Sequence, residues 1–285
     1  MFMVEVHIVS VGLSSLLNML KSGKASNILD GFGSPVEMEK ALTEDRSLRW
    51  RLRDALAGYL FPEGQALDGK LVAEARKASA ELNSLLGFLE DEYPGEGWRE
   101  RVEHVSAVYL LHTDTWTGRA AAAALKTALE RMGFSHTETR ELKGFSQQDF
   151  TAGLEDLKDE VRRIVAKHKR ARILLNPTGG FKPESGAMAV IAAESGLETY
   201  YIHETFRKIV KIPPASELKV KITEEEIKDE AAAIWLGISL DSIIGWLLTK
   251  NTALLSLWAT LSLPVLAYRA KRLINKYRTI KRHQK

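Results

Sequence analysis

Hydrophobic positions follow two different periods along residues 1–214, and this pattern predicts an α/β fold. Short apolar runs rich in β-branched residues are typical of buried strands, and they occur at residues 4–11, 105–111, 173–175 and 198–203. Between them, apolar residues recur every three or four positions, as in amphipathic helices. Because strands that alternate with helices pair in parallel, we expect a Rossmann-like, mainly parallel sheet.

Residues 36–92 interrupt this alternation after the first strand and helix. Both halves of the stretch, EMEKALTEDRSLRWRLRDALAGYL and KLVAEARKASAELNSLLGFLEDEY, have helical spacing. We interpret them as an inserted pair of helices that forms a side layer or a dimer surface. The arginines at 46–53 are more typical of a solvated helix face than of a site.

Three polar loops follow predicted strands and precede predicted helices. They contain Gly12-Leu13-Ser14-Ser15, Thr113-Asp114-Thr115, and Asn176-Pro177-Thr178-Gly179-Gly180-Phe181-Lys182. In a parallel sheet such loops lie at one edge, where ligands bind. Paired glycines allow close approach to the backbone, and helix N-termini attract anions. The three loops together favour a nucleotide-type site, although each loop alone is equally consistent with a plain helix cap, for which Ser14 or Ser15 is a natural N-cap.

Composition narrows the chemistry. The chain has no cysteine, which excludes disulfides, thiolate zinc sites and a cysteine nucleophile. Its seven histidines lack metal-ligand spacing, so we expect neither a metal nor a cofactor. Residues 1–230 carry 31 Lys and Arg against 36 Asp and Glu, and this excess of acid does not favour binding to DNA.

The composition changes after residue 214. Residues 231–249 and 253–268 are two apolar runs that contain one acidic residue, Asp241, and residues 269–285 form a basic tail. Their lengths are near the lower limit for crossing a bilayer core of about 30 Å. The pattern favours a two-span membrane hairpin with the tail on the cytoplasmic side, and a charge such as Asp241 within a span is usually functional. A pair of buried helices in a dimer interface is the alternative.

The loops resemble those of the CRISPR-associated Rossmann-fold (CARF) proteins, and most closely the ring nuclease branch of type III CRISPR systems. The resemblance covers residues 3–214 and rests on Gly12–Asn18, the TDTxxG motif at Thr113–Gly118, and NPTGGFK at Asn176–Lys182. The family has Gly-Thr-Ser-Leu-Leu where this chain has Gly-Leu-Ser-Ser-Leu-Leu, so either Ser14 or Ser15 takes the place of the family serine. Alignment on Leu-Leu-Asn favours Ser15.

The resemblance implies a homodimer that binds a cyclic oligoadenylate, usually cyclic tetra-adenylate, and cleaves it without metal in an antiviral defence system. A ribose 2′-OH would attack the neighbouring phosphate and leave a 2′,3′-cyclic phosphate end. Lys182 would stabilise the developing charge, and Ser15 or Ser14 would hold the 2′-OH or the phosphate. The amides of Gly179 and Gly180 would hold phosphate. Three side chains would contact adenine or ribose: Thr113 and Asp114 of the second loop, and Asn176 of the third loop.

Two further functions remain open at this stage. For the ring nuclease we expect a cytoplasmic sensor domain that the hairpin attaches to the inner membrane. In the first alternative, the chain is a cyclic-oligoadenylate-gated membrane effector that binds without cleaving. In the other, it is a ligand-activated ribonuclease of the HEPN type, because Arg278 and His283 have the spacing of its R-x4-H motif. The short basic tail makes the ribonuclease the weaker of the two.

Overall fold

The sheet that organises the molecule has six strands. The computed structural model describes residues 4–23, 34–145, 150–179, 182–202 and 208–214, all within the first of two units of the chain, Met1–Leu218. The strands are β1 (Glu5–Ser10), β2 (Val105–Thr113), β3 (Thr137–Leu142), β4 (Arg172–Asn176), β5 (Glu198–Ile202) and β6 (Ile209–Ile212).

The order of the strands is β3-β2-β1-β4-β5-β6. The first five pair in parallel, and β6 pairs antiparallel with β5. The chain builds outward from β1 to β3 on one side and then returns to add β4 and β5 on the other. This confirms the predicted Rossmann-like α/β fold and puts the switch in strand order between β1 and β4, where such sheets bind ligands.

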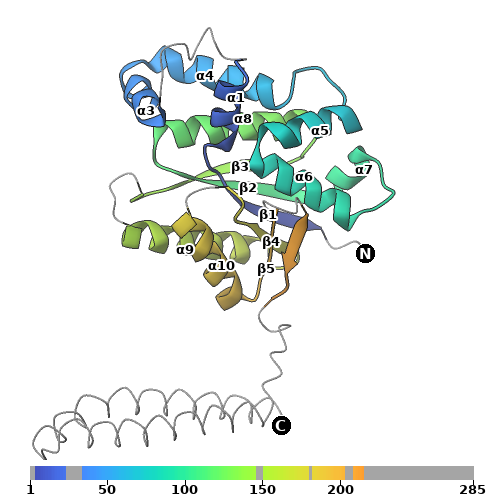
Figure 1. The fold of residues 1–285 in the computed structure, drawn as a ribbon. Coiled ribbons are helices and arrows are strands. Elements are labelled where there is room, and N and C mark those ends of the chain that lie inside the picture. Colours follow the sequence, from blue (N-terminus) through green and yellow to red (C-terminus); the bar gives the residue numbers. More distant parts are fainter. Residues whose placement is uncertain (1–3, 24–33, 146–149, 180–181, 203–207, 215–285) are drawn as a thin grey trace, which may run out of the picture. The chain divides into compact units, whose positions relative to one another are not determined.

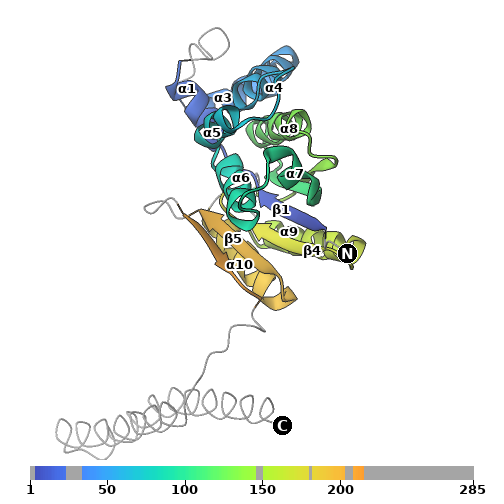
Figure 2. The same ribbon diagram turned by 90° about the vertical axis from the view of Figure 1, so that its right-hand side faces the viewer.

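Helices cover both faces of the sheet (Figures 1 and 2). One face carries α1 (Ser14–Lys21), α3 (Pro35–Glu44), α4 (Arg46–Leu60), α5 (Gly69–Ala78), α6 (Ala80–Glu92), α7 (Trp98–Glu103) and α8 (Trp116–Arg131). The other face carries α9 (Phe150–Lys167) and α10 (Lys182–Ser195). The unequal distribution follows from the long helical stretch between β1 and β2.

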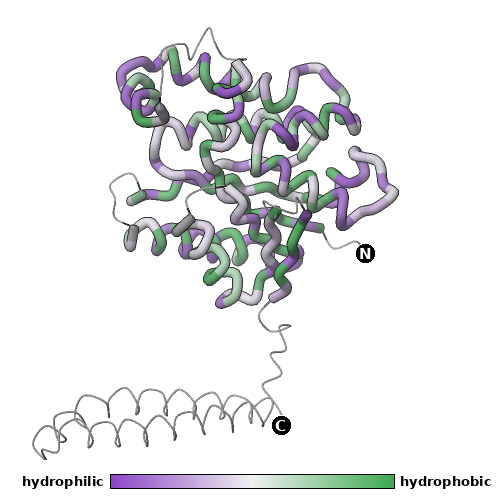
Figure 3. The backbone as a smooth tube through the Cα atoms, viewed as in Figure 1, coloured by the Kyte–Doolittle hydropathy of each residue, from purple (hydrophilic) through white to green (hydrophobic). Residues whose placement is uncertain are grey.

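Alternate residues of the central strands enter two separate cores. In β1, Val9 packs under α1, α4 and α6, whereas Val6 and Ile8 pack under α9 and α10. All six residues of β1 are buried, as expected for a central strand covered on both faces. Along the covering helices hydrophobic and hydrophilic positions alternate, which gives each helix one face for the core (Figure 3).

The inserted region, residues 36–92, contains four helices in the structure rather than the predicted pair. The additional breaks lie at Asp45 and Ser79, which adopt extended backbone and cap the helices that follow them. Asp45 accepts hydrogen bonds from the amides of Ser47 and Leu48, and Ser79 accepts one from Leu82. Both are favoured N-cap residues, and these local signals outweigh the continuous apolar spacing that predicted longer helices.

The arginines at 46–53 are only partly a solvated face. Arg49 lies over the Trp116 ring of α8, 3.4 Å from its centroid, and its guanidinium donates to the carbonyls of Leu42 and Thr43. A groove of about 430 Å³ between α4 and α8 is lined by Arg49, Trp50, Trp116 and Arg119. These contacts attach the inserted helices to the helix that follows β2.

No helix in the described part of the chain has the length and apolar character needed to cross a membrane. The apolar runs at 231–249 and 253–268, with Asp241, lie outside the described residues, and so do Arg278 and His283 of the basic tail. The predictions about the C-terminal region therefore remain predictions.

Candidate functional site

The loops after β1 and β4 lie side by side at the carboxyl edge of the sheet. Val9 of β1 is in register with Asn176 of β4. The hydroxyl of Ser10 donates a hydrogen bond of 2.6 Å to the carbonyl of Gly179 and lies 3.4 Å from the carbonyl of Asn176. The last residue of β1 therefore holds the loop that follows β4, at the point where the strand order switches.

Asn176 supports the loop after β4 from inside the protein. Its side chain is completely buried, and its amide nitrogen donates to the hydroxyls of Ser84, at 2.7 Å, and Tyr200, at 3.3 Å. Its amide oxygen accepts a hydrogen bond from the backbone N–H of Thr178 at 3.1 Å. We predicted that Asn176 contacts adenine or ribose, but this geometry gives it the role of shaping the loop.

A chain of buried polar groups connects Asn176 with the opposite edge of the sheet. The Tyr200 hydroxyl lies 2.9 Å from Nδ1 of His7, whose Nε2 lies 3.3 Å from the Glu5 carboxylate. Arg172 donates to the other oxygen of Glu5 at 2.8 Å. Burial opposes ionisation of Glu5, but its hydrogen bond to His7 and the nearby Arg172 hold its pKa below the usual value. Burial raises the pKa of Tyr200, which keeps its hydroxyl neutral. Such a fully bonded network fixes the strand ends rigidly.

Ser14 at the start of α1 does not cap its own helix, so the prediction of a serine N-cap is wrong. The N-cap residue is Leu13, which makes no side-chain cap bond. Ser14 instead donates to the Glu81 carboxylate at 2.7 Å and accepts from the amide of Ala80 at 3.0 Å. The other oxygen of Glu81 accepts the N–H of Gly12 at 2.8 Å. A carboxylate from α6 therefore accepts the hydrogen bonds that Gly12 and Ser14 donate from the loop after β1.

Among the described residues at this edge, two hydroxyls have no hydrogen-bond partner. Ser15 is fully buried, and neither its Oγ nor the buried Oγ1 of Thr178 has a partner. Unpaired buried hydroxyls are uncommon in proteins, and these two are able to bond to a ligand that reaches this edge of the sheet. They lie in the two adjacent loops that follow β1 and β4, and Ser15 is the serine that alignment favoured.

The loop after β2 begins α8 with a side-chain cap. Thr115 accepts the N–H of Gly118 at 3.1 Å, as the cap interpretation of this loop predicts, and its hydroxyl lies 3.0 Å from that of Thr113. Glu39 of α3 accepts the N–H groups of Trp116 and Thr117 at 2.7 and 2.8 Å. Here too, a carboxylate of the inserted helices accepts hydrogen bonds from backbone N–H groups at a helix N-terminus. Asp114 lies in the same loop and is partly exposed.

His112, the second-last residue of β2, is a buried titratable group beside this loop. Its Nδ1 lies 2.9 Å from the carbonyl of Thr113. Burial lowers the pKa of His112 below 6.5, although the hydrogen bond to Thr113 acts in the opposite direction. The imidazole is therefore neutral near pH 7 and donates from Nδ1 to the carbonyl.

Lys182 is the first residue of α10, as the sequence predicted from the loop and the following helix. The side chain of Lys182 and the residues Gly180 and Phe181 lie outside what the structure describes. Lys182, the expected cation of the site, is therefore the first residue of α10. The loop before it follows β4, at the switch in strand order. Among the described residues, no group of three His, Asp or Glu side chains is arranged to hold a metal.

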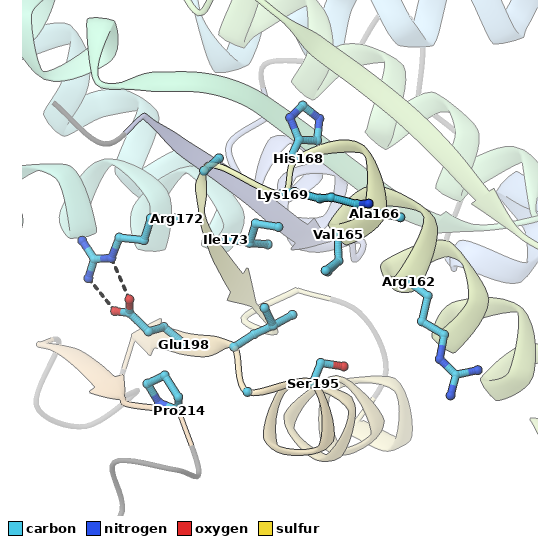
Figure 4. Close-up of a pocket in the computed structure, with 13 residues that line it drawn as sticks. Arg162, Val165, Ala166, His168, Lys169, Arg172, Ile173, Ser195, Glu198 and Pro214 are labelled. Atoms are coloured by element: carbon cyan, nitrogen blue, oxygen red, sulfur yellow. Dashed lines mark hydrogen bonds and ion pairs between the residues drawn. The ribbon is translucent and has the colours of Figure 1, made fainter. Parts of the chain in front are cut away.

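A cavity of about 610 Å³ lies at the opposite, amino-terminal edge of β4 and β5 (Figure 4). Arg172 and Glu198 form a bidentate ion pair at one side of it, and Arg162 and Lys169 of the α9 region line the other. None of the predicted site residues lines this cavity. This cavity is therefore separate from the predicted site.

Comparison with known families gives one match. Residues 76–215 match the CRISPR-associated protein family Cas_APE2256, a CARF-domain family. This part of the chain is therefore similar to a CRISPR-associated protein family. It runs from α5 to β6 and includes Glu81 and the loops after β2 and β4, whereas β1, Ser14 and Ser15 precede it. No curated protein matches the chain.

The sequence analysis did not predict that two carboxylates, Glu81 and Glu39, accept hydrogen bonds from the loops after β1 and β2. Each lies in the first half of an inserted helix, where acidic residues are common because they favour the helix dipole. Nothing in their spacing connects them with loops 67 to 78 residues away. The buried role of Asn176 was also missed, because its position after a strand is equally typical of a ligand contact.

Proposed function

We propose that the chain binds a cyclic oligoadenylate, with cyclic tetra-adenylate as the expected ring, at the carboxyl edge of β1 and β4. The observation that supports this most is the pair of unpaired buried hydroxyls, Ser15 and Thr178, in the two loops at the switch in strand order. The match of residues 76–215 to a CARF-domain family supports the ligand class. Two chains related by a two-fold axis would enclose one ring.

The proposed reaction is cleavage of the ring without metal. The 2′ oxygen of a ribose attacks the adjacent phosphorus, the bond from phosphorus to the 5′ oxygen breaks, and the leaving 5′ oxygen receives a proton. A linear product with a 2′,3′-cyclic phosphate end results. Because the nucleophile belongs to the substrate, the protein has to position the ring and stabilise the charge on the phosphate oxygens.

The residues of the two loops divide these tasks in the proposal. Lys182 at the start of α10 neutralises the developing negative charge, and Ser15 or Ser14 holds the 2′-OH or the scissile phosphate. The amides of Gly179 and Gly180 hold phosphate, while Thr113 and Asp114 contact ribose or adenine. Asn176 does not touch the ring and instead fixes the backbone of Thr178.

Product analysis with labelled ring tests this function. Purified full-length protein is incubated with radiolabelled cyclic tetra-adenylate in the presence of a chelator, with the Lys182→Ala variant alongside. We expect linear products with cyclic phosphate ends, and a rate at least about 100-fold lower for Lys182→Ala, the usual effect of losing a group that stabilises transition-state charge. Equal rates for both proteins would contradict the role of Lys182.

A second candidate function is a ligand-gated membrane effector. The two apolar runs at 231–249 and 253–268 support it, because a predicted membrane hairpin could respond to the ligand as well as attach the protein to the membrane. Tight binding with an intact ring in the same assay would favour the effector over the ring nuclease. In that case, changes at Asp241 would abolish toxicity in cells while binding persists.

A further inference from the structure

The Glu81 carboxylate lies between the loops after β1 and β4. Its side chain is only 2% exposed, and it accepts three hydrogen bonds, from the N–H of Gly12 and from the hydroxyls of Ser14 and Ser79. A Cβ atom added at Gly179 would lie 2.4 Å from its Oε1. The carboxylate is therefore in close contact with both loops at the switch in strand order.

The donors that Glu81 takes are of the kind that hold phosphate in this fold. A backbone N–H of the loop after the first strand and a hydroxyl at the start of the next helix both point at one anion. In the structure this anion is a side chain of the protein itself. A phosphate group could not bind beside it at the same donors, because two anions this close repel each other strongly in a buried environment.

We propose that Glu81 is an internal latch: it fills the anion position of the β1 loop in the free protein, and a phosphate of the bound ligand displaces it from Gly12 and Ser14. The inference rests on the proposed function, because it concerns the same site. Displacement would free two donors for the ligand next to Ser15, whose hydroxyl has no partner.

Displacement of the carboxylate would affect the start of α6. Ser79, which precedes α6, bonds to Glu81 within the same helix start, so we expect the two residues to move together. Other hydrogen bonds between α1 and this region run from Ala80 N–H to Ser14 and from Asn18 to the carbonyls of Lys77 and Ala78. Ligand binding would thus loosen the contact of α1 with the α5–α6 junction, which carries the change into the inserted helices.

A plain structural tie is the competing explanation, and the Glu81→Gln variant separates the two. Gln keeps the shape but replaces one accepting oxygen with an NH₂ group, which cannot accept the bonds from Gly12, Ser14 and Ser79 together. Either role predicts a lower melting temperature. Only the latch predicts tighter ligand binding, by about tenfold, because the ligand no longer competes with a full set of charged hydrogen bonds.

The test measures the Kd by calorimetry with full-length protein and the 2′-deoxy-2′-fluoro analogue of cyclic tetra-adenylate, which lacks the attacking hydroxyl. Asp68→Asn is the matched control, because it removes one negative charge from the inserted helices at the far end of α5, about 15 Å along that helix. We expect Glu81→Gln to bind about tenfold more tightly than wild type and Asp68→Asn to bind equally.

The outcomes separate this inference from the proposed function. Equal or weaker binding by a folded Glu81→Gln variant, with normal binding by wild type, overturns the latch alone. Absence of binding by wild type overturns the proposed function and the latch with it. If Glu81→Gln does not fold, Glu81→Asp replaces it: its carboxylate is one methylene shorter and reaches Gly12 less well, so tighter binding supports the latch and unchanged or weaker binding overturns it.

Discussion

The loops after β1 and β2 differ from the loop after β4 in how their polar groups are satisfied. At the start of α1 and of α8, carboxylates of the inserted helices take the backbone N–H groups, through Glu81 and Glu39. The backbone of the loop after β4 is instead held by hydrogen bonds to two neutral, buried side chains, Ser10 and Asn176. The first two loops are closed by internal anions, and in the described part of the third loop no carboxylate accepts a bond.

This difference shows that a glycine- or serine-rich loop at the carboxyl edge is not in itself an open anion site. The sequence of each loop suits phosphate equally well. What distinguishes them is which distant side chain has been placed against them. Under the proposed function, the loop after β1 receives phosphate only after Glu81 leaves its hydrogen bonds with Gly12 and Ser14, whereas the described part of the loop after β4 has no such bond to break.

The largest expected effect concerns the close packing around the loop after β4. In Gly179→Ala, the new Cβ would lie 2.3 Å from the carbonyl oxygen of Ser10, a backbone atom that cannot move aside easily. We expect a loss of about 2–3 kcal/mol in the free energy of unfolding, measured by urea denaturation. Gly186→Ala is the control, because its Cβ meets open space in α10, and it should be neutral or slightly stabilising. Equal stability of the two variants would contradict the close approach.

A smaller effect is expected at the loop after β2. Glu39→Gln removes a carboxylate charge that accepts three hydrogen bonds from α8. The donors are the backbone N–H groups of Trp116 and Thr117 and the Thr117 hydroxyl. We expect a loss of about 1 kcal/mol in unfolding free energy, from weaker hydrogen bonds and a lost favourable interaction with the helix dipole. Glu74→Gln on the exposed face of α5 should change stability by less than about 0.5 kcal/mol. A similar loss in both variants would mean that Glu39 does not close this loop.

The smallest effect is a change in pH dependence at His112. Burial holds its folded-state pKa below 6.5, so the unfolded chain binds a proton there more readily than the folded one. The stability due to neutral His112 is therefore fully present above about pH 6.5 and is lost as the pH falls through and below that value. His112→Gln should give a shallower fall in unfolding free energy between pH 7 and 5. His168, whose pKa burial also lowers, should still contribute in the variant. Parallel curves for wild type and variant would contradict the burial argument.

The sequence predicts the central strands of the sheet well because each of them carries its signal locally. The apolar runs at β1, β2 and β4 and the helical spacing between them require no knowledge of distant contacts. The edge at which the three polar loops meet then follows from parallel pairing. Residues 76–215 also carry enough of the family pattern to be matched.

The details of the site could not be predicted because they depend on long-range packing. Glu81 contacts Ser14 only because the α5–α6 junction folds onto α1, and periodicity does not specify which loop a helix start will meet. For the same reason Ser14 was expected to cap its helix and Asn176 to face a ligand. In both cases a side chain from the inserted helices, Glu81 or Ser84, provides the partner.

Equilibrium binding of radiolabelled cyclic tetra-adenylate to the full-length protein tests the central claim most directly. The account predicts saturable binding at a stoichiometry of one ring for two chains, with competition by unlabelled ring and little competition by a linear oligonucleotide of the same length. Absence of saturable binding, or equal competition by the linear oligonucleotide, would contradict a site for the cyclic ligand at the carboxyl edge of β1 and β4.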